Sequence, residues 1–234
     1  MRLFVSFLVI SVFYLDRIHA QEFRLEAGIA AMDRQHYATA LRTFRALDKS
    51  GNPQAGNNIG YMYEQGWGVP QDYAEAMKWY RKAAQQGLAE GEYNLGILYQ
   101  NGYGVAKNRS EAKRWFEKSA KKGFKDAQFM MGRIFQNGWG VKANGIKALA
   151  WYKSAAKKGL VKAQFWTGYM FLSGDAGDEQ AVKGYAWTEV SRINGYDGAV
   201  EVLDYASLSM KDSEVRMAKA LAKQCLVSNL RQCP

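Results

Sequence analysis

One segment of the chain recurs three times at a fixed interval of 36 residues, from Gly60, Gly96 and Gly132 onward. Each copy has a glycine-rich centre with an aromatic residue, followed by a run that ends in small residues. The same step also aligns two further series, which extend beyond the third copy: Trp79, Trp115, Trp151 and Trp187, and Gly87, Gly123, Gly159 and Gly195. A period of about 20–50 residues is typical of stacked repeats, in which each repeat buries its apolar face against its neighbours. The period therefore predicts a solenoid.

Within one period, the residue pattern predicts two helices joined by a tight turn. The first helix spans residues 53–65, and Gly66 and Gly68 supply its end and the turn. Asp72 together with Glu75 is typical of the start of a second helix with a capping box. Small and aromatic residues of this second helix follow a helical spacing and predict one buried stripe: Ala76, Trp79, Tyr80, Ala83 and Ala84.

Two kinds of repeated residue have an expected packing role. Gly60 and its counterparts lack a Cβ atom, which lets the partner helix approach closely. Aromatic residues occupy the same position in each turn, and their strict recurrence predicts that they pack over the next repeat: Trp67, Tyr103 and Trp139. Binding of a ligand by these turn aromatics is the alternative.

At these residues the chain resembles the Sel1-like repeat family, which is related to the tetratricopeptide solenoids. Residues Ala55 to Gly87 reproduce the consensus sequence of the family, with Ile59 in place of its leucine. This consensus has the form A…LG…Y..G.GV..D…A..WY.KAA..G. The resemblance implies an all-α fold, a right-handed superhelical solenoid of αα-hairpins. It also implies a protein that binds other proteins and catalyses nothing, and it leaves the partner open.

The pattern divides the chain into four parts. Residues 1–20 resemble a signal peptide, with Arg2, an apolar run and Ala20 at the expected cleavage point; a short uncleaved anchor is the alternative. Residues 21–54 predict an atypical tetratricopeptide-like hairpin, and residues 55–198 predict four repeats of 36 residues. Residues 199–234 predict capping helices, the last of which begins with Ser209 as its N-cap.

The two cysteines of the chain, Cys225 and Cys233, lie close together near its C-terminal end. Nearby thiols of an exported protein usually pair, so we expect a disulfide that fixes the tail. A redox-active pair is the alternative, but the spacing lacks the Cys-x-x-Cys form. Export predicts a bacterial periplasmic protein, with secretion as the alternative.

The sequence offers little for catalysis. Cleavage after Ala20 would leave His36 as the one histidine, and no HExxH motif, Ser-His-Asp set or Cys/His cluster is present. The GWG and GYG segments lack the GK[ST] ending of a phosphate loop. We therefore expect no enzyme, cofactor or metal. Relatives proposed to act on cell-wall substrates carry paired cysteines in each repeat, and this chain does not.

The net charge of +10 indicates attraction to acidic surfaces. Cations gather at the end of each second helix, for example Lys118, Lys121 and Lys122, where they also complement the helix dipole. An alternative function is therefore binding of an acidic envelope polysaccharide or peptidoglycan through a basic surface. Export makes nucleic acid an unsuitable partner.

Positions that vary between copies are the candidates for recognition. In tetratricopeptide geometry, three rows on the first helices face a concave groove: Asn57, Tyr93, Phe129 and Phe165; Tyr61, Ile97, Arg133 and Tyr169; and Glu64, Gln100, Gln136 and Leu172. Aromatic residues and arginine dominate binding hot spots. We therefore expect a groove centred on Tyr61, Phe129, Arg133 and Tyr169 that holds a peptide or loop of another envelope protein. The alternative is that the aromatics fill the gap to the adjacent helix.

Overall fold

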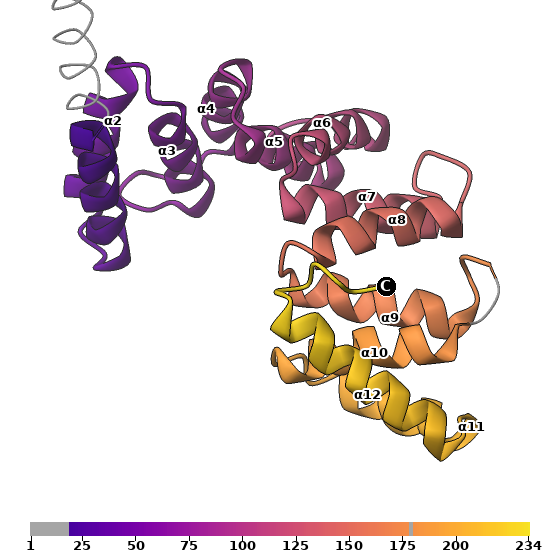
Figure 1. Ribbon diagram of the computed structural model, residues 1–234. Coiled ribbons are helices and arrows are strands. Elements are labelled where there is room, and N and C mark those ends of the chain that lie inside the picture. Colours follow the sequence, from indigo (N-terminus) through magenta and orange to yellow (C-terminus); the bar gives the residue numbers. More distant parts are fainter. Residues whose placement is uncertain (1–18, 178–179) are drawn as a thin grey trace, which may run out of the picture. The chain divides into compact units, whose positions relative to one another are not determined.

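The computed structural model describes residues 19–177 and 180–234, and within these residues it contains helices and no strand (Figure 1). Most of the expected signal peptide, residues 1–18, lies outside the described part. The chain forms two compact units, the first ending at Asn108 and the second beginning at Arg109. The all-α fold expected from the repeat is confirmed.

The first unit contains the atypical hairpin and the hairpin that follows it. Residues 19–33 are helical, and after them come α2 (Tyr37–Lys49), α3 (Pro53–Gln65), α4 (Tyr73–Gln85) and α5 (Ala89–Asn101). Each of α2, α3 and α4 packs against its successor in the chain. The apolar stripe of α4 is buried as its spacing predicts, with Tyr80 inaccessible to solvent and Trp79 half-buried.

The second unit contains seven helices in its described part. They are α6 (Arg109–Lys121), α7 (Lys125–Asn137), α8 (Gly145–Ala156), α9 (Val161–Ser173), α10 (Ala181–Ile193), α11 (Ala199–Ser209) and α12 (Asp212–Val227). Figure 1 shows α12 packed along α10, which closes this end of the unit. Trp187 of α10 lies in the centre of the resulting core and is inaccessible to solvent.

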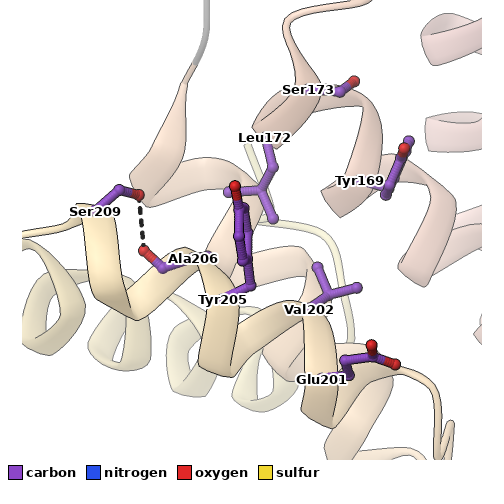
Figure 2. A pocket seen from close by; sticks show the side chains of 8 residues that line it. All are labelled: Tyr169, Leu172, Ser173, Glu201, Val202, Tyr205, Ala206 and Ser209. Carbon is purple, nitrogen blue, oxygen red and sulfur yellow. Dashed lines mark hydrogen bonds between the residues drawn. The ribbon is translucent and has the colours of Figure 1, made fainter.

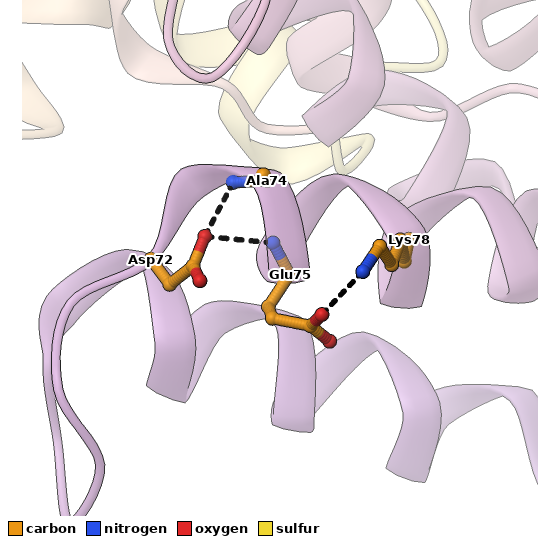
Figure 3. A network of polar contacts seen from close by, with 4 residues as sticks. All are labelled: Asp72, Ala74, Glu75 and Lys78. Atoms are coloured by element: carbon orange, nitrogen blue, oxygen red, sulfur yellow. Dashed lines mark hydrogen bonds and ion pairs between the residues drawn. The ribbon is translucent and has the colours of Figure 1, made fainter.

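Local side chains explain where the helices begin and end. Gly66 ends α3 in the left-handed conformation, with φ of 72°. Asp72 begins α4, and its carboxylate accepts hydrogen bonds from the backbone N–H groups of Ala74 (2.8 Å) and Glu75 (3.0 Å) (Figure 3). The reciprocal half of a capping box is not formed, because the Asp72 N–H donates to the Tyr63 carbonyl at 2.9 Å. The Glu75 carboxylate instead pairs with Lys78.

Close approach between the helices of a hairpin depends on glycine, as expected. A Cβ atom on Gly60 would lie 2.8 Å from the Tyr80 ring, and one on Gly132 would lie 2.5 Å from the Tyr152 ring. The atypical first hairpin uses the same device, since a Cβ atom on Gly28 would lie 2.5 Å from a ring carbon of Phe44. Real Cβ atoms do not come this close to a ring, so a side chain at these positions would separate the helices.

Two of the three turn aromatics, Trp67 and Tyr103, pack on the preceding hairpin, whereas the sequence suggested the next one. Trp67 stacks on Tyr37 with ring centroids 5.4 Å apart, and Tyr103 stacks on Tyr73 at 4.8 Å. The reason lies in the turn itself, because a Cβ atom on Gly68 would lie 2.7 Å from Tyr37. The glycine thus brings the turn against the hairpin before it, and its aromatic neighbour covers that contact.

The C-terminal helices differ from expectation in one detail. Ser209 is the last residue of α11, and its hydroxyl donates to the Ala206 carbonyl at 3.0 Å, so it is not the N-cap of α12. That helix begins at Asp212 after the extended Lys211, whose N–H donates to the Glu214 carboxylate at 2.8 Å.

The C-terminal tail is held by two contacts. A disulfide joins Cys225 to Cys233, as expected, and the Trp187 indole N–H donates to the Pro234 carbonyl at 3.1 Å.

Candidate functional site

The expected groove residues of the first unit serve mostly in packing. Asn57 is 1% exposed and accepts a hydrogen bond from the Asn94 amide at 2.9 Å, so it offers no surface to a partner. Tyr61 is 36% exposed and lies edge-on to Trp67 at 5.3 Å. The others are half-buried: Glu64, Tyr93, Ile97 and Gln100.

Glu64 is occupied by its own hairpin. Its carboxylate accepts a hydrogen bond of 2.5 Å from the Tyr80 hydroxyl, which comes from the buried side of α4. Burial raises the pKa of Tyr80 far above its usual range, and the nearby Glu64 charge acts in the same direction. The pair therefore joins α3 to α4 with a tyrosine that keeps its proton.

The same device recurs in the second unit. Gln136 accepts a hydrogen bond from the Tyr152 hydroxyl at 2.7 Å, and burial raises the pKa of Tyr152 above its usual range. Phe129 is half-buried against the Tyr152 ring at 5.4 Å, and the Arg133 guanidinium lies 4.9 Å from the Trp139 ring. These expected groove residues therefore also contribute to the hairpin itself.

An open groove of about 580 Å³ lies between α9 and α11 in the second unit (Figure 2). Its lining has eight residues, most of them apolar: Tyr169, Leu172, Ser173, Glu201, Val202, Tyr205, Ala206 and Ser209. Tyr169 is 38% exposed and Tyr205 is 79% exposed, so both rings offer free surface. Of the expected groove positions, Tyr169 and Leu172 are thus brought together in a defined groove.

The α11 residues of this groove were not expected from the sequence. A further step of 36 residues extends the three rows from Phe165, Tyr169 and Leu172 to the following positions on α11: Glu201, Tyr205 and Leu208. Two of these, Glu201 and Tyr205, line the groove. The 36-residue interval was the one sequence feature that could have predicted these two residues. The consensus of the family is lost after the fourth copy, and no recognisable motif marks α11.

Tyr169 is supported from behind by an aromatic cluster. Its ring lies 5.4 Å from Trp166 and 6.4 Å from Phe165, and Phe165 stacks on Tyr196 at 4.5 Å. Phe165 itself is buried and offers no surface to a partner. Aromatic side chains held by their neighbours lose little conformational entropy on binding, which makes Tyr169 a suitable anchor.

The polar groups of the groove are few. The Ser173 hydroxyl oxygen accepts a hydrogen bond from the Asp175 N–H at 3.3 Å, and the Ser209 hydroxyl donates to Ala206 (Figure 2). Glu201 is the one charged residue in the lining, and it is exposed. Among the described residues, no cation forms an ion pair with Glu201. The groove thus presents apolar surface with a carboxylate at one end.

The basic ends of the second helices have internal partners. Lys82 pairs with Asp48 at 2.6 Å, and Lys121 pairs with Glu117 at 2.9 Å. Lys158 donates to the Gly123 carbonyl at 2.7 Å, across the interval of one repeat. Lys82 joins α4 to α2 and Lys158 complements a carbonyl group, whereas the Lys121 pair lies within α6. These contacts account for the three cations without an acidic ligand.

Metal-ligating side chains are scattered over the described part of the chain. Within it, no group of three or more His, Cys, Asp or Glu side chains is placed to hold a metal ion. None of the described helices combines the length and the apolar character that crossing a membrane requires.

An all-helical chain with a 36-residue period of αα-hairpins is a solenoid repeat protein. The Sel1 repeat model matches residues 53–88, 89–124, 125–160 and 161–190. The chain therefore belongs to the Sel1 repeat family. Repeats of this family are in general protein–protein interaction modules, and its proteins are generally binding scaffolds without catalytic activity.

Solved structures agree with this assignment. A Sel1 repeat protein from Oxalobacter formigenes is 32% identical, with 76% of this chain and 73% of that chain covered and a TM-score of 0.70. A protective antigen of uropathogenic Escherichia coli with an SLR fold is 27% identical, with 84% and 50% covered and a TM-score of 0.54. An immunity protein from Pseudomonas aeruginosa, at 17% identity, 92% and 84% coverage and a TM-score of 0.56, shares the fold. No curated protein sequence matches the chain significantly.

Proposed function

We propose that the protein is a non-catalytic adaptor of the cell envelope that holds a peptide or loop of another protein in the groove between α9 and α11. The observation that carries this proposal is the pair of exposed rings, Tyr169 and Tyr205, on the two walls of an apolar groove. Buried aromatic anchors supply most of the affinity of protein interfaces. The family's general role in protein binding supports the same assignment.

The envelope location rests on two features of the chain. Its first 20 residues have the pattern of a signal peptide, and Cys225 and Cys233 form a disulfide. A bacterial periplasm suits both features, and secretion is the alternative. Fractionation of the host, with the processed N-terminus read by mass spectrometry, tests this part: recovery of an unprocessed chain from the cytoplasm would contradict it.

The composition of the groove supports binding without catalysis. Its lining contains two serines, one glutamate and no histidine. Both serine hydroxyls are engaged with neighbouring backbone groups, so neither is paired with a general base. This arrangement supports a binding role for the groove.

Cross-linked affinity capture from envelope extract tests the proposal. The baits are the full chain, the variant Tyr169→Ala/Tyr205→Ala and, as a control, Ile146→Ala, which removes an exposed apolar side chain of α8 outside the groove. We expect one or two proteins to be captured by the wild type and the control and lost from the groove variant. Helicity and melting temperature of all three baits should agree.

A salt series separates this function from binding of an acidic polymer. Apolar contacts tolerate high ionic strength, whereas attraction between exposed charges is screened. Capture of protein that survives high salt supports the adaptor. Capture of glycan alone, lost equally from all baits at high salt, would assign the function to the basic surface and reject the groove.

A further inference from the structure

Helix α11 is locally acidic in a basic protein. The whole chain has 32 lysines and arginines against 22 aspartates and glutamates. The sequence of α11, AVEVLDYASLS, contains Glu201 and Asp204 and no cation. Only Glu201 lines the groove, and Asp204 lies on another part of the same helix surface. The groove therefore has the opposite charge to the protein as a whole.

The carboxylate and an aromatic ring share one face of this helix. Glu201 and Tyr205 are four residues apart, so their side chains lie one above the other along α11. Figure 2 shows Glu201, Val202, Tyr205 and Ala206 following one another along α11, and Leu172 of α9 lines the same groove. A bound segment would thus meet apolar surface beside Tyr205 and a carboxylate one turn away.

We propose that the partner segment presents an arginine to Glu201 and Tyr205, next to an apolar residue that fills the space between Leu172 and Ala206. A guanidinium can form two parallel hydrogen bonds with a carboxylate and can also stack on an aromatic face, whereas an ammonium does neither as well. The contact of a cation with the Tyr205 ring adds a further attraction. This inference rests on the proposed function and names the class of partner for the same groove.

Selection from a phage-displayed library of random peptides tests the inference even while the natural partner is unidentified. The full chain is the target, and Tyr169→Ala/Tyr205→Ala is the counter-target that removes peptides bound elsewhere. We expect the enriched peptides to share an arginine close to an aromatic or aliphatic residue. Failure to enrich any peptide that distinguishes the two targets would reject the groove, and with it both proposals.

Binding of the best peptide is then measured by fluorescence anisotropy to matched charge variants. Glu201→Gln should weaken binding about two- to fivefold, in line with the loss of an exposed ion pair, while the cation–π contact with Tyr205 remains. Asp204→Asn, which removes the same charge from the same helix outside the groove, should leave binding unchanged. A peptide with Glu in place of Arg should bind Glu201→Arg better than it binds the wild type.

Two outcomes would overturn the inference while leaving the adaptor function in place. One is enrichment of apolar peptides without a basic residue. The other is an equal loss of affinity in Glu201→Gln and Asp204→Asn. That result would mean that the summed negative charge of α11 attracts the peptide and that no ion pair forms between Glu201 and an arginine of the peptide. In both cases the Tyr169/Tyr205 variant would still fail to bind.

Discussion

Two glycines of α3 stand one turn apart and have opposite roles. A Cβ atom on Gly60 would lie 2.8 Å from the Tyr80 ring and 3.2 Å from the Ala76 carbonyl oxygen. A Cβ atom on Gly56 would meet its nearest neighbour, an Asp48 oxygen, at 3.4 Å, an ordinary contact. The recurrence of glycine at 36-residue intervals therefore reflects the contact with the partner helix at Gly60, and position 56 is free of this constraint.

The two glycine-to-alanine substitutions should change stability in opposite directions. Gly60→Ala should destabilise the chain by about 1–3 kcal/mol, because the added methyl group overpacks the α3–α4 contact. Gly56→Ala should be neutral or stabilise by up to about 1 kcal/mol, because alanine favours the helix. Urea unfolding followed by circular dichroism measures both. Equal effects would show that the Tyr80 contact does not limit the hairpin.

The buried tyrosines predict a loss of stability in alkali. A tyrosine of the unfolded chain ionises near pH 10, whereas the raised pKa keeps Tyr80 protonated in the folded chain. The stabilisation is complete below pH 10 and is lost as the pH rises above it, by about 1.4 kcal/mol per pH unit for one proton. In Tyr80→Phe the slope of unfolding free energy against pH should be smaller by that amount. The same slope in both proteins would contradict this account.

The sequence predicted which residues occupy the same position in different repeats better than it predicted the contacts that those residues make. The 36-residue step correctly aligned the glycines and the ring partners Tyr80 and Tyr152. It could not reveal that Glu64 and Gln136 accept hydrogen bonds from those two hydroxyls, because the acceptor and the donor are 16 residues apart in both hairpins and vary in type between copies. Two expected groove residues therefore belong partly to the scaffold.

At the scale of single helices, the N-cap of α4 is the feature most open to test. Asp72→Ala removes the acceptor of two backbone N–H groups and should lower the free energy of unfolding by about 1 kcal/mol. Glu75→Gln is the matched control, since its partner Lys78 is exposed and the pair should add little. Chemical denaturation at neutral pH compares the two. A larger loss in Glu75→Gln than in Asp72→Ala would contradict this account of the helix start.

Helix boundaries followed the local signals where those signals were unambiguous. Gly66 and the capping Asp72 correctly predicted the end of α3 and the start of α4. Ser209 was misassigned because serine is a frequent N-cap residue, whereas here α11 continues to Ser209 and the next helix begins three residues later. The actual start of α12 depends on Glu214, which satisfies the N–H of Lys211 from within the first turn.

At the scale of the whole molecule, the disulfide holds the last residues against the core of the second unit. Cys225 and Cys233 are both buried, and the Trp187 indole bonds to Pro234 beyond them. Opening this short loop should lower the stability of the second unit by about 2–3 kcal/mol. Thermal melting with and without a reductant measures the effect. The double variant Cys225→Ser/Cys233→Ser should melt at one temperature under both conditions, and a reductant effect on it would point to another cause.

The sequence predicted the repeat architecture and only part of the groove. Tyr169 and Leu172 were expected because the consensus of the family extends through α9, and both line the groove. Glu201 and Tyr205 were not expected, since α11 keeps the 36-residue interval but none of the glycines or aromatics of the turn. A surface formed by one regular and one degenerate repeat is thus visible only when the helices are placed in space.

The edge-on contact between Trp166 and Tyr169 makes the groove visible to spectroscopy. Trp166 is half-buried, and its ring lies 5.4 Å from the tyrosine on which a partner would sit. Occupation of the groove should therefore change the polarity around this indole and shift its emission. Subtracting the emission of Trp166→Phe from that of the wild type would isolate this indole as an intrinsic reporter, and titration could follow binding without any attached dye.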